Sequence, residues 1–209
     1  MKNSFDLKAK EWDNNNSRVV RALKVASAIK DQIKINKNMK ALEFGSGTGL
    51  LGFNLIKDVD SLTFMDTSKE MLEQVKIKLI DNEIKKFNVL YCDLLNESLN
   101  EKYDLIFSLM VLHHIAEYKK IIKKLTEALN PSGFICISDL DKEDGSFHSN
   151  SGEENIPHFG FEREKIVIEL NNNGLENIKT STAYVNKKML NDELREYPLF
   201  LITGQKRDQ

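Results

Sequence analysis

Apolar and polar positions divide the chain into segments that alternate between strand length and helix length. Apolar runs of strand length cover residues 39–44, 61–66, 87–93, 103–109 and 134–139. Helical spacing of apolar residues covers residues 18–35, 67–79, 118–129 and 162–170. This alternation predicts an α/β fold with a doubly wound, mostly parallel sheet. The final runs, 178–185 and 198–204, are joined by a short segment and predict an antiparallel pair.

A length of 209 residues fits a single domain, which we divide into four segments. Residues 1–36 form a helical N-terminal flap that carries the only tryptophan, and 37–139 form the core with the predicted ligand site. Residues 140–160 lack clear periodicity, and connections of that length are often lids or binding loops. Residues 161–209 add a helix and the strand pair.

A glycine-rich turn follows the first apolar run. Gly45, Gly47 and Gly49 stand at every second position, and the apolar residues behind them predict a helix. Glycines and a helix start offer backbone N–H groups to an anionic group. Gly47, Gly49 and Gly52 also satisfy the dinucleotide fingerprint, so a dinucleotide remains an alternative. Glu43 favours the first register, because a carboxylate there suits an ammonium or sulfonium ligand better than a pyrophosphate.

Two later strands end on acids. Asp66 ends the second predicted strand, just before a capping box of Thr67 and Glu70, and Asp93 ends the third. Ligands of open α/β sheets bind at the carboxyl ends of the strands. Asp66 can therefore accept hydrogen bonds from both hydroxyls of a ribose. In the alternative interpretation, each acid only caps its own turn.

Three stretches together resemble class I S-adenosylmethionine-dependent methyltransferases of the small-molecule, UbiE-like type. The segment from Glu43 to Gly49, EFGSGTG, looks like motif I of that family. Residues 103–115, YDLIFSLMVLHHI, look like motif IV, and 129–139, LNPSGFICISD, look like the following helix-to-strand turn. The resemblance implies a Rossmann-like, seven-stranded sheet with an antiparallel last strand. It also implies S-adenosyl-L-methionine as the methyl donor and S-adenosyl-L-homocysteine as the product.

The resemblance also implies which residues bind the donor. Backbone groups of the glycine turn and carbonyls after the fourth strand would hold its methionine part, and Glu43 would offset its ammonium charge. Asp66 would bind the ribose, and Asp93 the adenine amino group. Trp12 either covers the pocket or only anchors the flap. The full predicted set is Glu43, Gly45, Ser46, Gly47, Gly49, Asp66, Thr67, Cys92, Asp93, Leu94, Ser108, Leu109 and Trp12.

The reaction that this resemblance implies, in-line methyl transfer, needs positioning and desolvation more than acid–base groups. All four histidines nevertheless lie in the two segments nearest the predicted site. His148 and His158, on the predicted lid, and His114, from the His113–His114 pair, are candidate general bases. The other member of that pair is expected to pack or cap. Their spacing is not a zinc pattern and no cysteine joins it, so no metal is expected.

Composition and motif IV point to a small-molecule acceptor. The net charge is −2, without a basic stripe, and residues 108–111 lack the Pro-Pro motif of base amino-methylases, so nucleic acid is disfavoured. Cys92 and Cys136 fall in predicted strands and are expected as buried thiols. No apolar run approaches about 18 residues and no signal peptide is apparent, so no membrane association and a cytoplasmic location are expected. The oligomeric state and the acceptor atom (O, N, S or C) are left open.

Two other functions are weighed against this one. A non-catalytic S-adenosylmethionine-binding or regulatory protein would have a degenerate site, whereas every donor-site position is intact. An NAD(P)-dependent oxidoreductase is suggested by Tyr184 and Lys188, which match Tyr-x-x-x-Lys. That pair falls in a predicted strand rather than on a helix, so the match is interpreted as coincidence.

Overall fold

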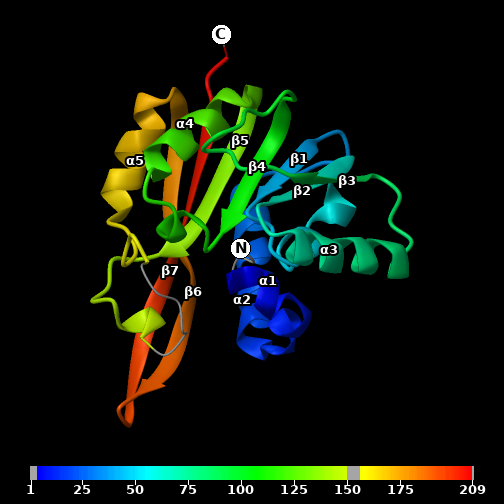
Figure 1. The fold of residues 1–209 in the computed structure, drawn as a ribbon. Coiled ribbons are helices and arrows are strands. Elements are labelled where there is room, and N and C mark those ends of the chain that lie inside the picture. Colours follow the sequence, from blue (N-terminus) through cyan, green and yellow to red (C-terminus); the bar gives the residue numbers. More distant parts are fainter. Residues whose placement is uncertain (1–3, 150–155, 209) are drawn as a thin grey trace.

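A seven-stranded sheet forms the centre of the molecule (Figure 1). The computed structural model describes residues 4–149 and 156–208. The strand order is β3-β2-β1-β4-β5-β7-β6; β7 runs antiparallel to β5 and to β6, and the other pairs are parallel. The predicted fold class is confirmed. The strands are β1 (Lys40–Phe44), β2 (Ser61–Asp66), β3 (Phe87–Tyr91), β4 (Tyr103–Leu109), β5 (Leu129–Leu140), β6 (Leu175–Leu190) and β7 (Glu193–Lys206).

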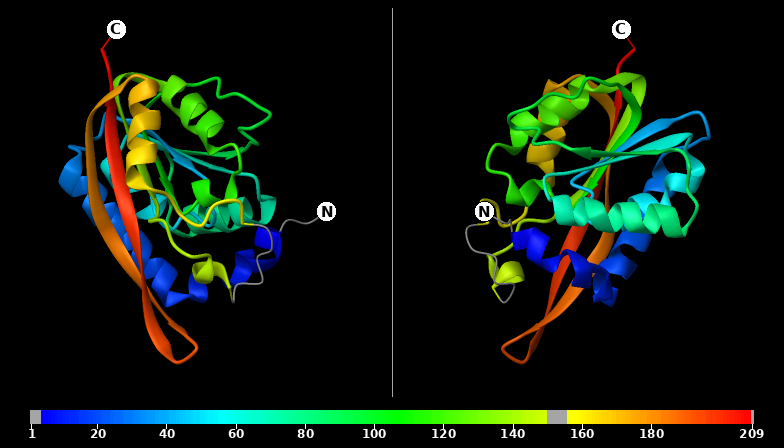
Figure 2. Two further views of the ribbon diagram at one scale, coloured as in Figure 1. Left: turned by 90° about the vertical axis from the view of Figure 1, so that its left-hand side faces the viewer. Right: turned by 45° about the vertical axis from the view of Figure 1, so that its right-hand side comes forward.

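Helices cover both faces of the sheet (Figure 2). Residues of α2 and α3 pack into one apolar cluster with β1 and β2, and residues of α4 and α5 pack into another on the opposite face. The helices are α1 (Ser4–Lys8), α2 (Asn16–Gln32), α3 (Lys69–Asp81), α4 (Tyr118–Glu127) and α5 (Arg163–Asn172). Single 3₁₀ turns are η1 (Ala9–Asn14), η2 (Gly52–Asn54), η3 (Ile56–Asp58), η4 (Leu112–His114) and η5 (Ser146–His148).

The prediction of a helix directly after the glycine turn is wrong. The chain instead makes the two short turns η2 and η3 before β2 begins at Ser61. Gly52, which lowers helix propensity, fits closely between Glu43 and Phe64, and the polar residues 57–60 end the segment. No helix N-terminus therefore faces the ligand site here, and the anion-binding argument based on a helix dipole does not apply.

The closing strand pair is longer than predicted. β6 and β7 pair from Leu175 to Lys206 and are joined by Asn191 and Asp192 alone. Both turn residues have positive φ, 50° and 63°, which is the conformation of a tight hairpin turn. The hairpin therefore extends beyond the rest of the sheet (Figure 1).

The predicted lid, residues 140–160, is partly ordered by contacts with the sheet. An isolated parallel bridge joins Asp141 to Phe161, and Arg163 forms a bidentate ion pair with Asp141 at 2.6 and 2.7 Å. Residues 150–155 of this segment lie outside the described residues. Among the described helices, none is long and apolar enough to cross a membrane.

Candidate functional site

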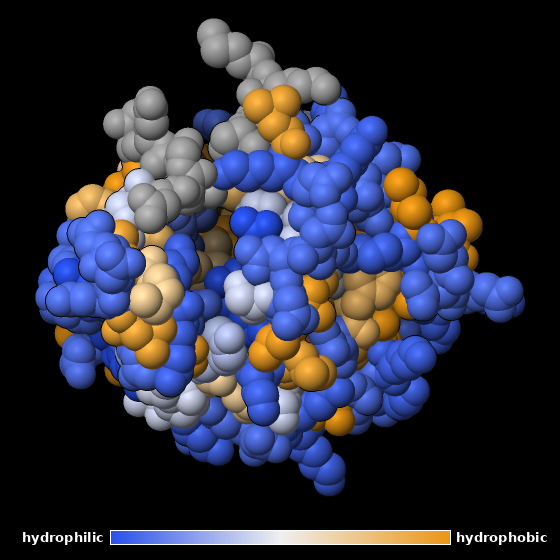
Figure 3. All heavy atoms as spheres, turned by 90° about the horizontal axis from the view of Figure 1, so that it is seen from below, coloured by the Kyte–Doolittle hydropathy of each residue, from blue (hydrophilic) through white to orange (hydrophobic). Residues whose placement is uncertain are grey.

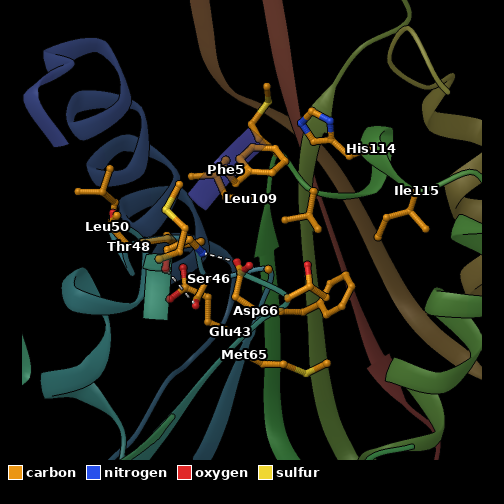
Figure 4. A pocket seen from close by; sticks show the side chains of 18 of the residues that line it. Phe5, Glu43, Ser46, Thr48, Leu50, Met65, Asp66, Leu109, His114 and Ile115 are labelled. Carbon is orange, nitrogen blue, oxygen red and sulfur yellow. Dashed lines mark hydrogen bonds between the residues drawn. The ribbon is translucent and has the colours of Figure 1, made fainter. Parts of the chain in front are cut away.

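One cavity of about 460 Å³ lies at the carboxyl ends of β1 to β4. That volume is within the range of small-molecule sites, and the face seen from below is hollowed (Figure 3). Side chains from the strand ends and from α1 point into it (Figure 4). The wall includes Phe5, Trp12, Arg18, Arg21, Glu43, Gly45, Ser46, Gly47, Thr48, Met65, Asp66, Thr67, Cys92, Asp93, Leu94, Leu109, Met110, Val111, His114 and Ile115.

The glycine turn and Asp66 are held together by a hydrogen bond across the cavity floor. The Gly47 N–H donates to Asp66 Oδ2 at 2.7 Å, and Asp66 is labelled in Figure 4. The Ser68 N–H donates to Oδ1 at 2.8 Å. Gly47 has φ +52°, a conformation that other residues adopt rarely. Burial raises the pKa of Asp66, and these N–H groups partly oppose the rise. Each carboxylate oxygen can accept further hydrogen bonds, so Asp66 remains able to bind a ligand.

Glu43 is a buried acid below the glycine turn. Its side chain is 3% exposed, and Oε2 accepts the Gly52 N–H at 3.2 Å. A Cβ at Gly52 would lie 2.3 Å from that oxygen, so the contact requires glycine. Burial is the main cause that raises the pKa of Glu43 to about 8, and the Gly52 N–H and Lys78 oppose it. Neutral Glu43 would gain its charge readily when a cationic ligand group approaches.

The wall beyond β3 carries the residues predicted to surround an adenine. Cys92, a free thiol, and Leu94 are both buried there. Cys136, in β5, is also a buried free thiol, so the prediction of two buried thiols is confirmed. Asp93 also caps its own turn: Oδ1 accepts the Leu95 N–H at 3.0 Å, and Oδ2 accepts from Asn96 Nδ2 at 2.7 Å. Asp93 therefore both lines the cavity and caps its own turn, so neither interpretation of this residue excludes the other.

The N-terminal flap, here residues 4–15, closes the cavity from outside. Asp13 accepts from Thr48 Oγ1 at 2.5 Å and forms an ion pair with Lys78 at 2.8 Å. Asp6 accepts from Ser68 Oγ at 2.6 Å. Trp12 lines the cavity under the guanidinium of Arg18, 3.7 Å from the ring centre. The flap therefore contacts the glycine turn, α3 and the residue that caps α3.

Three of the four histidines gather at the far end of the cavity. His113 and His114 lie in η4, and His148 lies in η5; their ring centres are 4.0 to 5.6 Å apart. The His113 ring is fully buried, and its Nδ1 lies 2.6 Å from Asp139 Oδ1. Burial acts to raise the pKa of Asp139, but the His113 ring and the Leu140 N–H outweigh it, so the net shift is downward. Phe5 packs edge-on against His114 at 5.3 Å (Figure 4).

The comparisons with known proteins agree with this geometry. The sequence model of the family described as "Methyltransferase domain" matches residues 42–135, the segment that runs from β1 into β5 and supplies most of the wall. The fold is shared with a solved putative methyltransferase of Bacillus halodurans, which superposes with a TM-score of 0.70 at 11% identity, covering 87% of this chain and 98% of its own. Residues 42–135 therefore match the methyltransferase-domain family, and the chain has the class I methyltransferase fold.

Individual relatives within the family are distant. An uncharacterized methyltransferase, C1347.09, of Schizosaccharomyces pombe is 28% identical over 66% of this chain and 54% of its own. A ubiquinone biosynthesis O-methyltransferase of Hydrogenovibrio crunogenus is 24% identical over 56% of this chain and 48% of its own. The chain thus spans about half the length of these relatives. The solved DhpI–S-adenosylhomocysteine complex superposes with a TM-score of 0.72 at 17% identity, covering 98% of this chain and 93% of DhpI.

Four of the predicted site residues lie outside the cavity wall. Gly49 is buried below the turn, where a Cβ would lie 2.9 Å from Phe64, and Ser108 is buried within β4. His148 contacts the other histidines without lining the cavity. His158 lies farther away, with Nε2 3.2 Å from the Ala116 carbonyl and its ring against Tyr118. The contacts of His158 are those of a packing residue, and its predicted role as a base loses support.

Several wall residues were missed in the sequence. Arg18 and Arg21 lie one turn apart on α2 and both line the cavity. Their spacing of three residues, which places both on one face of the helix, is the signal that the sequence offers. Met110 adopts φ +60°, which no local pattern predicts for methionine. Thr48 was overlooked because its hydrogen bond to Asp13 crosses 35 residues.

Proposed function

We propose that this protein transfers the methyl group of S-adenosylmethionine to a small molecule held in the same cavity. The observation that carries the proposal is the position of Asp66. Its carboxylate lies at the end of β2, is tied to the glycine turn at Gly47, and forms part of the wall of a 460 Å³ cavity. A cavity with this carboxylate open to it fits a ribose and is not filled by the protein's own side chains.

The donor would occupy the end of the cavity formed by β1 to β3. Asp66 would accept hydrogen bonds from the ribose hydroxyls, and Cys92, Asp93 and Leu94 would flank the adenine. Glu43, buried with a pKa of about 8, would become charged in response to the donor's ammonium group, directly or through water. Leu109, in the wall at the end of β4, would contact the methionine part.

The acceptor would occupy the end formed by α2, Met110 and His114. Arg21 suggests its chemistry, because in the described part of the chain its Nε has no hydrogen-bond partner and its Nη1 reaches only the Asn186 amide oxygen, at 3.3 Å. Burial, then repulsion from Arg18, lowers the pKa of Arg21 to about 10, so the guanidinium stays charged at neutral pH. An acceptor with a carboxylate or phosphate group would pair with it.

The protein's contribution to the reaction would be orientation and exclusion of water. The flap, fastened by Asp13 and Asp6, would close over the donor once it is bound, and in-line transfer requires little more. His114 is the only histidine in the described part of the wall, so it is the remaining candidate to take a proton from the acceptor. A net charge of −2 supports an acceptor that is neither a nucleic acid nor a membrane surface.

The test is binding followed by turnover. Isothermal titration should give one site for S-adenosylmethionine and for S-adenosylhomocysteine, and no tight binding of NAD or NADP. Formation of S-adenosylhomocysteine should then be screened against small molecules with an acidic group, with their neutral amides or esters as matched controls. Binding without turnover across the panel would favour a regulatory binder, and tight NAD binding without S-adenosylmethionine binding would refute the proposal.

A further inference from the structure

The histidine cluster at the end of the cavity has the arrangement of a metal site. His113, His114 and His148 each offer one ring nitrogen, and these three nitrogens all lie within 4.8 Å of one another. Three imidazole nitrogens around one tetrahedral ion at ~2.1 Å lie about 3.4 Å apart, so rotation of the partly exposed His114 and His148 rings would bring the set to bonding distance. The cluster draws on two separate segments, η4 and η5.

His113 supplies an observation that points to a ligand. Its Nδ1 is paired with Asp139 at 2.6 Å, and its backbone N–H also donates to Asp139, at 3.3 Å. Its Nε2 is buried and has no hydrogen-bond partner among the described residues. A buried polar atom without a partner costs free energy, whether that atom is a donor or an acceptor. An ion that accepts the Nε2 lone pair would remove this cost.

Asp139 completes the arrangement expected around a metal-binding histidine. Histidine ligands commonly donate their second ring N–H to a carboxylate, which fixes the tautomer and the ring orientation. Asp139 is itself held, since its Oδ1 also accepts the Leu140 N–H at 2.7 Å. With a proton on Nδ1, the lone pair of His113 Nε2 is directed away from Asp139. In that tautomer, His113 presents Nε2 as a metal ligand.

The donor set selects the class of ion. Three neutral imidazoles suit zinc and the other late divalent transition metals, whereas magnesium and calcium prefer oxygen ligands. Three protein ligands also leave a coordination position open, as in zinc sites that bind water or substrate. His114 lines the cavity, so the open position would lie beside the proposed acceptor end.

We propose that His113, His114 and His148 bind one divalent transition-metal ion of the zinc type, with Asp139 orienting His113. This site was not expected from the sequence, because His148 lies 35 residues after His113 and the set follows no zinc spacing. The proposal concerns binding only and does not depend on methyl transfer; while the metal is bound, His114 would be a ligand and not the base considered above.

The experiment uses the full, untagged chain after chelator treatment and dialysis. Zinc titration should give one equivalent bound, and cobalt substitution should give the visible absorption of a low-symmetry nitrogen site. His114→Ala and His148→Ala should each lower zinc affinity at least about 100-fold, and Asp139→Asn should lower it about 10- to 100-fold. His158→Ala is the matched control, because this fourth histidine lies on the same loop but outside the cluster; its affinity should equal that of the wild type.

Folding of each variant is checked by circular dichroism in chelator. As a second readout, zinc should raise the melting temperature of the wild type and of His158→Ala, but not that of the double variant His114→Ala/His148→Ala. Absence of stoichiometric zinc binding to the wild type would overturn the proposal. So would unchanged affinity in the double variant, or an equal loss of affinity in His158→Ala.

Discussion

The two ends of the cavity are built differently. At the donor end, most of the wall comes from one part of the chain, residues 43–95, and much of that wall is backbone or strand-end side chain. At the acceptor end, α2, η4, η5 and β6 bring together residues as far apart as Arg21 and Asn186. The donor end therefore follows from strand order alone, whereas the acceptor end depends on long-range packing.

The largest expected effect tests the buried acid of the donor end. Glu43 has its pKa raised from 4.5 to about 8, so between these values the folded protein holds a proton that the unfolded chain has lost. Stability should therefore fall as pH rises through this window, by on the order of 4 kcal/mol from this residue. Glu43→Gln should match the wild type near pH 5 and exceed its stability near pH 8.

Urea unfolding of both proteins at a series of pH values measures this difference. A constant difference between wild type and Glu43→Gln over the whole pH range would show that Glu43 ionises normally, and the electrostatic description of the donor end would then be wrong.

The next effect separates two strand-end aspartates. Asp66→Asn should weaken S-adenosylhomocysteine binding by about 100-fold, since charge-assisted hydrogen bonds contribute roughly 1.5–3 kcal/mol each. Asp93→Asn is the matched control: its oxygens already cap the turn at Leu95 and Asn96, so its loss should stay below about 10-fold. Titration calorimetry measures both. Equal losses of S-adenosylhomocysteine affinity in the two variants would show that Asp66 has no special role in donor binding.

A smaller effect should appear at the acceptor end only. Arg21→Gln should raise the KM for an acidic acceptor about 10-fold or more, because one charged hydrogen-bond donor is removed. The Kd for S-adenosylhomocysteine should stay within about twofold of the wild type, since Arg21 would not touch the donor. The acceptor KM of Arg21→Lys, which keeps the charge, should lie between those of the wild type and Arg21→Gln. A large change in donor affinity would show that the two ends are not separate.

The smallest effect concerns the flap. Asp13→Asn should weaken S-adenosylhomocysteine binding a few-fold, because its ion pair with Lys78 and its bond to Thr48 are partly exposed and such contacts contribute about 1 kcal/mol. Asp58→Asn, which breaks the exposed ion pair with Lys30 outside the site, is the control and should not change binding. Identical affinities for Asp13→Asn and wild type would mean that the flap does not cover the donor.

The sequence placed most residues of the wall at the ends of β1 to β3 at one edge of the sheet, because the signals there are local. β1 ends at Phe44, just before Gly45, and β2 ends at Asp66. Because β1 and β2 are neighbouring parallel strands, Gly45 and Asp66 lie at the same edge of the sheet. The acceptor end could not be predicted in this way. The approach of His148 to His113 depends on how the segment after β5 folds back, and the partnership of Arg21 with Asn186 depends on the length of the β6–β7 hairpin. The missing helix after Gly49 was a local error of another kind, in which tertiary packing at Gly52 overrides an apolar pattern.

The flap of residues 4–15 has one further consequence. The apolar clusters of the described chain contain no residue before Ala22, so the first helical segment contributes little to the hydrophobic core. It contacts both ends of the cavity: Asp13 accepts from Thr48 and Asp6 accepts from Ser68 on one side, and Phe5 packs against His114 on the other. Limited proteolysis near the amino terminus would thus leave a folded protein with an uncovered crevice. The segment that covers the cavity is therefore separate from the segments that form the hydrophobic core.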